Sequence, residues 1–185
     1  RNYYVIGSLT NGLYQEFSAS VAHYARHDIC LISQYRSNRF DRETTELATI
    51  TTILMDLIAK YCKDKKKSCL IAGNAKPGIE ANREIQFFGR WVNSDHIHFL
   101  PNDRSSFSTH SSVDASEVAI CVNSTAGIEA LGRGVKILFC NFSENSFFDL
   151  YGEFKHGIWS MSDKGVTYEK FDRQLTKLLC LSKED

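Results

Sequence analysis

The sequence predicts an α/β fold with one doubly wound domain of 185 residues. Three observations support this prediction. Short apolar runs of strand length recur along the chain, segments with helical apolar spacing separate them, and turns rich in Gly, Ser and Asn follow most of the runs. Alternation of this kind is typical of a mainly parallel sheet of about five or six strands, whose post-strand turns all gather at one edge.

The first half of the chain contains three of the expected strands and three expected helices. The strands are the apolar runs at residues 3–6, 29–32 and 69–72. The helices cover residues 13–24, a long segment from Asp41 or Arg42 that ends in the basic run 63–67, and residues 79–88. The long helix is the clearest, because its apolar residues recur at spacings of three and four.

The second half continues the alternation. Strands are expected at residues 97–100, 118–122 and 135–139. A brief helix is expected at 113–116, a short one after Ser124, and an amphipathic one at 168–179. Residues 141–159 are rich in aromatic side chains, and we expect them to form a loop. The sequence contains no internal repeat and no clear linker.

The segment from Val118 onward is the most informative part of the chain. A buried strand ends in Ser124 and Thr125, either of which can cap the helix that follows. The free N–H groups of such a helix favour an anion, typically a phosphate. Gly127 permits close approach of a ligand or a strand, and Glu129 can accept hydrogen bonds from a ribose diol. The alternative is an ordinary helix cap followed by a solvated glutamate.

Other post-strand turns contribute further candidates to the same edge. Gly7 and Ser8 follow the first expected strand and can present N–H groups to a phosphate. Gln34 and Arg36 lie in the polar cluster after residues 29–32, and Lys76 follows the strand at 69–72. Arg36 and Lys76 are the cations best placed to neutralise a phosphate or a carboxylate, although a surface role is an equal alternative.

Charge and motifs exclude several functional classes. The 22 basic and 22 acidic side chains cancel, so we expect no general attraction to nucleic acid. The sequence has no Walker loop, and no Gly-x-Gly-x-x-Gly follows the first expected strand, which disfavours a dinucleotide oxidoreductase. Ser105, Ser106, His110 and Asp114 raise the alternative of a hydrolase, but no Gly-x-Ser-x-Gly motif is present.

Cysteine and histidine spacing predicts neither disulfides nor a metal. The six cysteines are scattered and form no C-x-x-C pair. We therefore expect all of them to be reduced, as in a cytoplasmic protein. His96 and His98 lie on one face of an expected strand, and neither they nor His110 and Glu117 have the spacing of a metal-ligand set.

One block of the sequence resembles a known family. Asn123-Ser124-Thr125-Ala126-Gly127-Ile128-Glu129-Ala130-Leu131-Gly132-Arg133-Gly134 is similar to a motif of bacterial surface-carbohydrate biosynthesis transferases. These are lipopolysaccharide and capsule enzymes related to the Kdo and sialic acid transferases. The segments 4–8, with Asn11, and 31–36 also resemble strand-end motifs of this family, and the likeness covers most of the chain.

The resemblance implies a GT-B-like glycosyltransferase, in which two Rossmann-like halves face each other across a cleft. Residues 1–185 would be a single Rossmann-like, donor-binding domain, the C-terminal half of a longer protein. Ser124 and Thr125 would bind the donor phosphate, Glu129 the ribose, and Gly7 with Ser8 the opposite side of the phosphate. Lys76 stands where many members have the histidine of a His-Pro pair. No catalytic base is evident, and in this family it usually comes from the other half.

The resemblance also implies the partners. The donor would be a nucleotide sugar of the CMP-Kdo or CMP-sialic type, used without a metal or other cofactor. The acceptor would be a glycan or glycolipid, and the N-terminal half of the same protein would complete the cleft. We expect a cytoplasmic location, with peripheral contact to the inner membrane through other parts of the protein. A non-catalytic nucleotide-sugar-binding module and a nucleotide-sugar epimerase remain alternatives.

Overall fold

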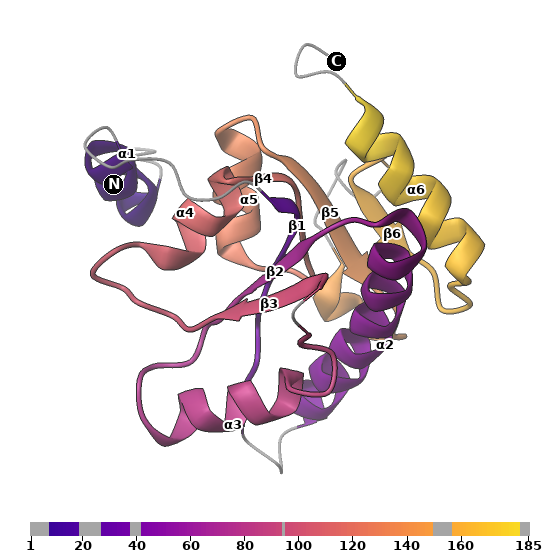
Figure 1. Ribbon diagram of the computed structural model, residues 1–185, viewed down its shortest axis with the longest axis horizontal. Coiled ribbons are helices and arrows are strands. Elements are labelled where there is room, and N and C mark those ends of the chain that lie inside the picture. The colour runs from indigo at the N-terminus through magenta and orange to yellow at the C-terminus, as the bar shows by residue number, and fades with distance from the viewer. Residues whose placement is uncertain (1–7, 19–26, 38–41, 94, 150–156, 182–185) are drawn as a thin grey trace, which may run out of the picture.

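A six-stranded, all-parallel sheet forms the centre of the computed structural model (Figure 1), which describes residues 8–18, 27–37, 42–93, 95–149 and 157–181. The strand order is β3-β2-β1-β4-β5-β6. The strands are β1 (His27–Ile32), β2 (Cys69–Ala72), β3 (Ile97–Leu100), β4 (Ser116–Cys121), β5 (Lys136–Asn141) and β6 (Ser160–Ser162). The predicted fold class, a Rossmann-like doubly wound α/β domain, is confirmed.

Six α-helices are described along the same residues, with a 3-10 turn after β5. They are α1 (Leu9–Ser18), α2 (Arg42–Lys65), α3 (Ile79–Phe88), α4 (Ser108–Asp114), α5 (Thr125–Gly132) and α6 (Tyr168–Cys180). The 3-10 turn is η1 (Ser146–Phe148). Among the described residues, no helix combines the length and the apolar character needed to cross a membrane.

Two predicted helices differ from the structure, one strand was not predicted, and each difference has a physical reason. The first helix begins at Leu9 rather than 13, because the Ser8 hydroxyl accepts the Asn11 N–H (3.2 Å) and so caps its first turn. The fourth helix covers Ser108–Asp114 rather than 113–116 and buries a polar sequence. Strand β6 lies just beyond the loop expected at residues 141–159 and was not predicted; its short Ser-Met-Ser sequence is held by pairing with β5. The strand expected at residues 3–6 lies outside the described residues.

The centre of the sheet is a topological switch point. Strand β1 pairs with β2 on one side and with β4 on the other, so that Cys30 lies between Leu70 and Ala119. From β1 the chain builds the sheet outward through β2 and β3, crosses back to β4 on the other side of β1, and continues outward through β5 and β6. In open parallel sheets a crevice forms at the carboxyl ends of the strands at this point, and ligands bind there.

Alternate residues of the strands build two apolar cores. Ile29 and Leu31 face α2, α3 and α6, whereas Cys30 and Ile32 face α4 and α5. In Figure 1, α2 and α6 lie together on the right of the view, and α4 and α5 lie together to the left, toward α1. Both faces of the sheet are thus covered, as parallel strands require.

Candidate functional site

A cleft of about 780 Å³ opens at the carboxyl edge of the sheet, around the switch point. The polar turns that follow strands β1 to β4 line this cleft, together with side chains of α4 and α5. The polar lining residues include Ser33, Gln34, Arg36, Asn74, Asn102, Asp103, Arg104, His110, Asn123, Ser124, Thr125 and Glu129. The structure therefore brings together five of the predicted site residues: Gln34, Arg36, Ser124, Thr125 and Glu129.

The amino end of α5 opens on this cleft. Ser124 occupies the N-cap position with extended backbone angles (φ −67°, ψ 135°), but its side chain makes no capping hydrogen bond. The N–H groups of Gly127 and Ile128 donate to the Ser124 carbonyl (3.0 and 3.2 Å). Thr125 and Ala126 have no earlier carbonyl within the helix to which they can donate. Their two N–H groups, with the hydroxyls of Ser124 and Thr125, form a donor set of the kind that binds anions.

Glu129 lies four residues after Thr125, and therefore on the same face of α5. Its carboxylate has a different partner at each oxygen. The Nε2–H of His110 donates to Oε2 at 2.9 Å, and the Ser8 hydroxyl donates to Oε1. The side chains of Glu129 and His110 are each only 11% exposed. Glu129 is thus a fixed hydrogen-bond acceptor in the wall of the cleft, and the solvated alternative does not describe it.

His110 is held by the aromatic rings around it. It lies in α4, where its ring packs against Tyr14 (5.0 Å between centroids) and Phe107 (6.1 Å). Burial and the neighbouring Asp114 raise the pKa of Tyr14 to about 12. Arg133 pairs with Asp114 at 2.8 Å and also donates to the side chain of Asn11 in α1 (2.6 Å). These contacts join α1, α4 and α5 beside the cleft.

The hydrolase grouping considered from the sequence does not form in this way. His110 contacts Glu129, while Asp114 pairs with Arg133. The hydroxyls of Ser105 and Ser106 donate to the Asp103 carboxylate at 2.6 and 2.8 Å, and these hydrogen bonds lower the pKa of Asp103. The four residues therefore take part in separate contacts rather than in one relay.

The floor of the cleft is fixed by two side chains. The Gln34 carbonyl oxygen accepts the N–H groups of Val122 and Asn123, both at 3.0 Å, and its amide nitrogen donates to the Asn123 side chain. Gln34 thus joins β1 to β4 across the switch point. The side chain is polar and lines the cleft, but both ends of its amide already have partners within the protein.

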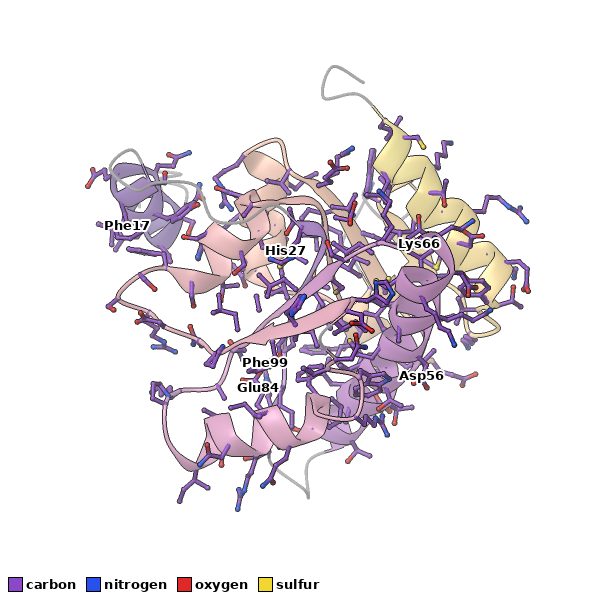
Figure 2. All side chains as sticks on the ribbon, viewed as in Figure 1. Phe17, His27, Asp56, Lys66, Glu84 and Phe99 are labelled. Atoms are coloured by element: carbon purple, nitrogen blue, oxygen red, sulfur yellow. The ribbon has the colours of Figure 1, made fainter. Side chains whose placement is uncertain are left out.

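The second of these side chains is Glu84, which sequence reasoning missed. It is 1% exposed, on the side of α3 that faces the sheet (Figure 2). Its carboxylate accepts the Ser33 hydroxyl at 2.5 Å and the N–H groups of Asn74 and Ala75, both at 2.9 Å. A glutamate in an amphipathic helix is normally solvated, so the pattern gave no signal of this role.

Comparison with known families adds the biological context. The sequence profile of a family described as "putative O-antigen biosynthesis protein" matches residues 1–173. The chain belongs to this family. A search of curated proteins found no match. Family membership supports the predicted link to surface-carbohydrate biosynthesis at this coarse level.

The cations are unevenly distributed around the cleft. Arg36 and Arg104 both line it and are exposed. Arg104 was missed from the sequence, because the stretch after β3 has no apolar pattern that marks it. Lys76 is exposed and lies outside the set of lining residues. Within the described part of the chain, no three His, Cys, Asp or Glu side chains group as a metal site.

The remaining predicted site residues have other surroundings. Gly127 faces the sheet: a Cβ there would lie 2.6 Å from the Cys121 sulfur and 3.2 Å from the Phe139 ring. Of the two partners foreseen for Gly127, the structure supports the strands. Ser8 reaches the site through Glu129, although it is not itself part of the cleft lining. Gly7 lies outside the described residues.

Proposed function

We propose that this chain is the nucleotide-sugar donor-binding domain of a glycosyltransferase in O-antigen biosynthesis. One observation carries the proposal: the amino end of α5 opens on a cleft at the switch point of the sheet, and Glu129 lines the same cleft one helical turn further on. This arrangement offers a phosphate site and a hydroxyl acceptor on a single helix face, at a spacing that suits a nucleotide.

The donor phosphate would bind at Thr125 and Ala126. A helix amino end carries roughly half a positive charge, and its free N–H groups stabilise an anion without a metal. Glu129 would accept hydrogen bonds from the ribose hydroxyls. Arg36 and Arg104 line the cleft at the turns after β1 and β3. They would neutralise a second anionic group, as in the sugar carboxylate of a CMP-Kdo or CMP-sialic-type donor.

The chemistry would be transfer of the sugar to an acceptor hydroxyl on a glycan or glycolipid. As the bond from sugar to phosphate breaks, negative charge grows on the leaving phosphate, where the α5 amino end and the arginines stabilise it. The polar side chains Gln34 and Glu84 are already hydrogen-bonded within the protein and hold the cleft in shape. The base that activates the acceptor would come from an N-terminal half facing this cleft.

The epimerase alternative fits the cleft less well. An epimerase of this architecture holds a dinucleotide through a glycine-rich turn after its first strand. Here the turn after β1 is Ser33-Gln34-Tyr35-Arg36, which contains no glycine and whose Gln34 side chain is bonded to β4. A non-catalytic binding module would share the donor site, and an acceptor-dependent turnover assay separates it from a transferase.

A donor screen tests the proposal. CMP-, UDP-, GDP- and dTDP-sugars are added to the chain in thermal-shift experiments, because a ligand at about 100 times its dissociation constant stabilises a protein by about 2.7 kcal/mol. Calorimetric titration then compares the parent with the double variant Ser124→Ala/Thr125→Ala. Loss of two hydroxyl donors to a charged phosphate predicts at least a ~30-fold weaker affinity.

Thr167→Ala is the matched control. Thr167 caps α6, far along the chain from the cleft, and its side chain accepts the Lys170 N–H. This variant is expected to lose about 1 kcal/mol of stability and to keep its nucleotide affinity. The Ser124 and Thr125 double variant is expected to show the opposite pattern, since Ser124 makes no capping bond. A parent that binds none of the four nucleotides contradicts the proposal. An unchanged affinity in the double variant moves the phosphate site elsewhere.

A further inference from the structure

The two partners of Glu129 are chemically different, and the difference is informative. The contact with His110 is a side-chain bond between α4 and α5, in which both residues are largely buried. The contact with Ser8 is made by an exposed hydroxyl at the start of α1. One carboxylate oxygen is therefore fixed within the protein, and the other accepts a hydroxyl at the side that solvent can reach.

Two aromatic rings and one hydrogen bond restrain the His110 side chain. Tyr14 of α1 and Phe107 pack against its ring, and the Glu129 carboxylate accepts its Nε2–H. The charged pair Asp114 and Arg133 lies at the same junction of α4 and α5. A glutamate on a helix surface ordinarily samples several rotamers, and ordering it on binding costs free energy. The bond from His110 removes that freedom in advance.

The Ser8 hydroxyl makes the contact that a sugar hydroxyl would make. An O–H donor lies against Oε1 of a carboxylate in the wall of the cleft. Ser8 also accepts the Asn11 N–H at the first turn of α1, so this hydroxyl already has a second role outside the cleft. Replacing the Ser8 hydroxyl by a ligand hydroxyl would leave the bond from His110 to Oε2 in place.

We infer that His110 is a positioning residue, which holds Glu129 so that Oε1 receives a hydroxyl of the ligand's ribose, and that Ser8 fills this place in the free protein. The inference rests on the proposed nucleotide site and adds how that site selects its ligand. Selection depends on the sugar of the nucleotide rather than on its phosphate. A nucleotide without ribose hydroxyls gains nothing from Glu129, whatever the state of His110.

The experiment measures this selection as a ratio. Calorimetric titration gives the affinities of CMP, UDP and GDP, each beside its 2′,3′-dideoxy analogue, for the parent chain. The expected preference of the parent for the ribose form is about tenfold or more, because hydrogen bonds to a charged acceptor are among the stronger ones. Glu129→Gln is expected to reduce this preference severalfold without weakening the dideoxy forms.

Variants at His110 separate positioning from packing. His110→Phe keeps a ring against Tyr14 and Phe107 but removes the Nε2–H donor, so the ribose preference should fall toward one. His110→Gln carries an amide N–H that reaches about the same place, and the preference should return to within about threefold of the parent. Thermal melts confirm that both variants fold. A preference that His110→Phe leaves intact, or that Gln fails to restore in a folded variant, overturns the role of His110.

Ser8→Ala tests the other half of the inference. Removal of the competing hydroxyl should strengthen ribonucleotide binding severalfold and leave the dideoxy forms unchanged. Weaker or unchanged ribonucleotide binding would show that Ser8 does not occupy the ligand's place. If the parent binds ribose and dideoxy forms equally, the proposed phosphate site at the amino end of α5 stands, but the ribose contact of Glu129 and this inference fail. If the parent binds no nucleotide, both fall together.

Discussion

The two faces of the sheet are covered in different ways. One face packs against α2, α3 and α6, and its core contains large side chains such as Tyr61, Phe88 and Phe171, all at most 2% exposed. The other packs against α4 and α5, helices of 7 and 8 residues. Its core is smaller and consists mainly of Cys, Ala, Ile and Val with Phe139.

The two faces therefore contribute differently: one mainly to the stability of the fold, the other mainly to the cleft. The face covered by α2, α3 and α6, here called the thick face, buries most of the large apolar side chains, and burial of apolar surface is the main favourable term in folding. The face covered by the short helices α4 and α5, here called the thin face, carries polar residues that reach the carboxyl edge of the sheet. Helix α4 buries Ser108, Ser112 and His110, each of which makes a side-chain hydrogen bond. The cleft is built from this face, and the thick face supports it.

The largest effect is expected from a cavity in the thick face. Phe171 is fully buried and packs edge to face on Tyr61, at 6.3 Å between ring centroids. Phe171→Ala should cost about 3–5 kcal/mol of unfolding free energy in urea denaturation. Phe147→Ala is the control, because Phe147 is 50% exposed and its loss should change stability by less than about 0.5 kcal/mol. Equal effects of the two variants would contradict the role of the buried Phe171 ring in the core under α2, α3 and α6.

A smaller effect is expected from overpacking the thin face. A methyl group at Gly127 would lie 2.6 Å from the Cys121 sulfur, closer than van der Waals contact permits. Gly127→Ala should therefore cost about 1–3 kcal/mol, despite the better helix propensity of alanine. The double variant Gly127→Ala/Cys121→Ala provides the space and should recover part of this loss, as chemical denaturation can measure. Strict additivity of the two substitutions would mean that the contact is not the cause.

The sequence predicted the elements of the thick face and most of the strands. Runs such as Cys69–Ala72 and the spacing in Arg42–Lys65 reflect burial directly, so pattern and structure agree. The same logic fails for α4, whose Ser-Thr-His-Ser-Ser sequence is polar and whose burial depends on hydrogen bonds with distant residues. Strand β6 has no apolar run, and only its pairing with β5 defines it.

The sequence predicted those site residues that directly follow a strand. It could not predict side-chain contacts between residues far apart in the chain. Ser124, Thr125 and Gln34 follow strands, and post-strand turns of a parallel sheet share one edge. The partners of Glu129 come from positions 8 and 110, which no local pattern relates to position 129. The Glu84 carboxylate likewise accepts hydrogen bonds from the turns after β1 and β2. Its role is therefore visible only once these two strands lie side by side.

A third prediction concerns the amino edge of the sheet, opposite the cleft. At the amino edge, Asp28 accepts hydrogen bonds from Lys67 (2.7 Å) and from the Ser68 N–H and hydroxyl (2.8 and 3.0 Å). Burial alone would raise the pKa of Asp28, but these bonds outweigh it and hold the pKa below its ordinary value. Because the pKa is lower in the folded state, the stabilisation is present above about pH 4 and is lost as the pH falls through the folded value.

Asp28→Asn is therefore expected to destabilise the protein by roughly 1 kcal/mol at neutral pH, less than a buried pair would because Lys67 is partly exposed. The difference from the parent should shrink below about pH 4 in urea melts. Asp64→Asn, which breaks an exposed pair with Lys60, is the control and should change stability little at any pH. A loss at Asp28 that is the same at pH 3 and pH 7 would show that the contact does not depend on charge.

The last prediction leaves stability unchanged and uses the cysteines as reporters of the two faces. Cys180 is exposed, and the other five are buried. Burial raises the pKa of Cys30, Cys62 and Cys121 to about 12, so the folded protein holds few reactive thiolates. Iodoacetamide should label Cys180 at once and the buried thiols only through opening. All six should react after denaturation if they are reduced, as the sequence predicts.

The order of labelling within the buried set distinguishes the faces. Cys30 and Cys121 belong to the core under α4 and α5, whereas Cys62, Cys69 and Cys140 belong to the core under α2, α3 and α6. Local opening costs less where fewer apolar contacts must be broken. Peptide mapping by mass spectrometry should therefore find Cys30 and Cys121 labelled first, below the temperature of global unfolding. A nucleotide bound at the amino end of α5 should slow these two and leave the other three unchanged, because it stabilises the face from which the cleft is built. Labelling of all five at one common rate would mean that the two faces open as a single unit.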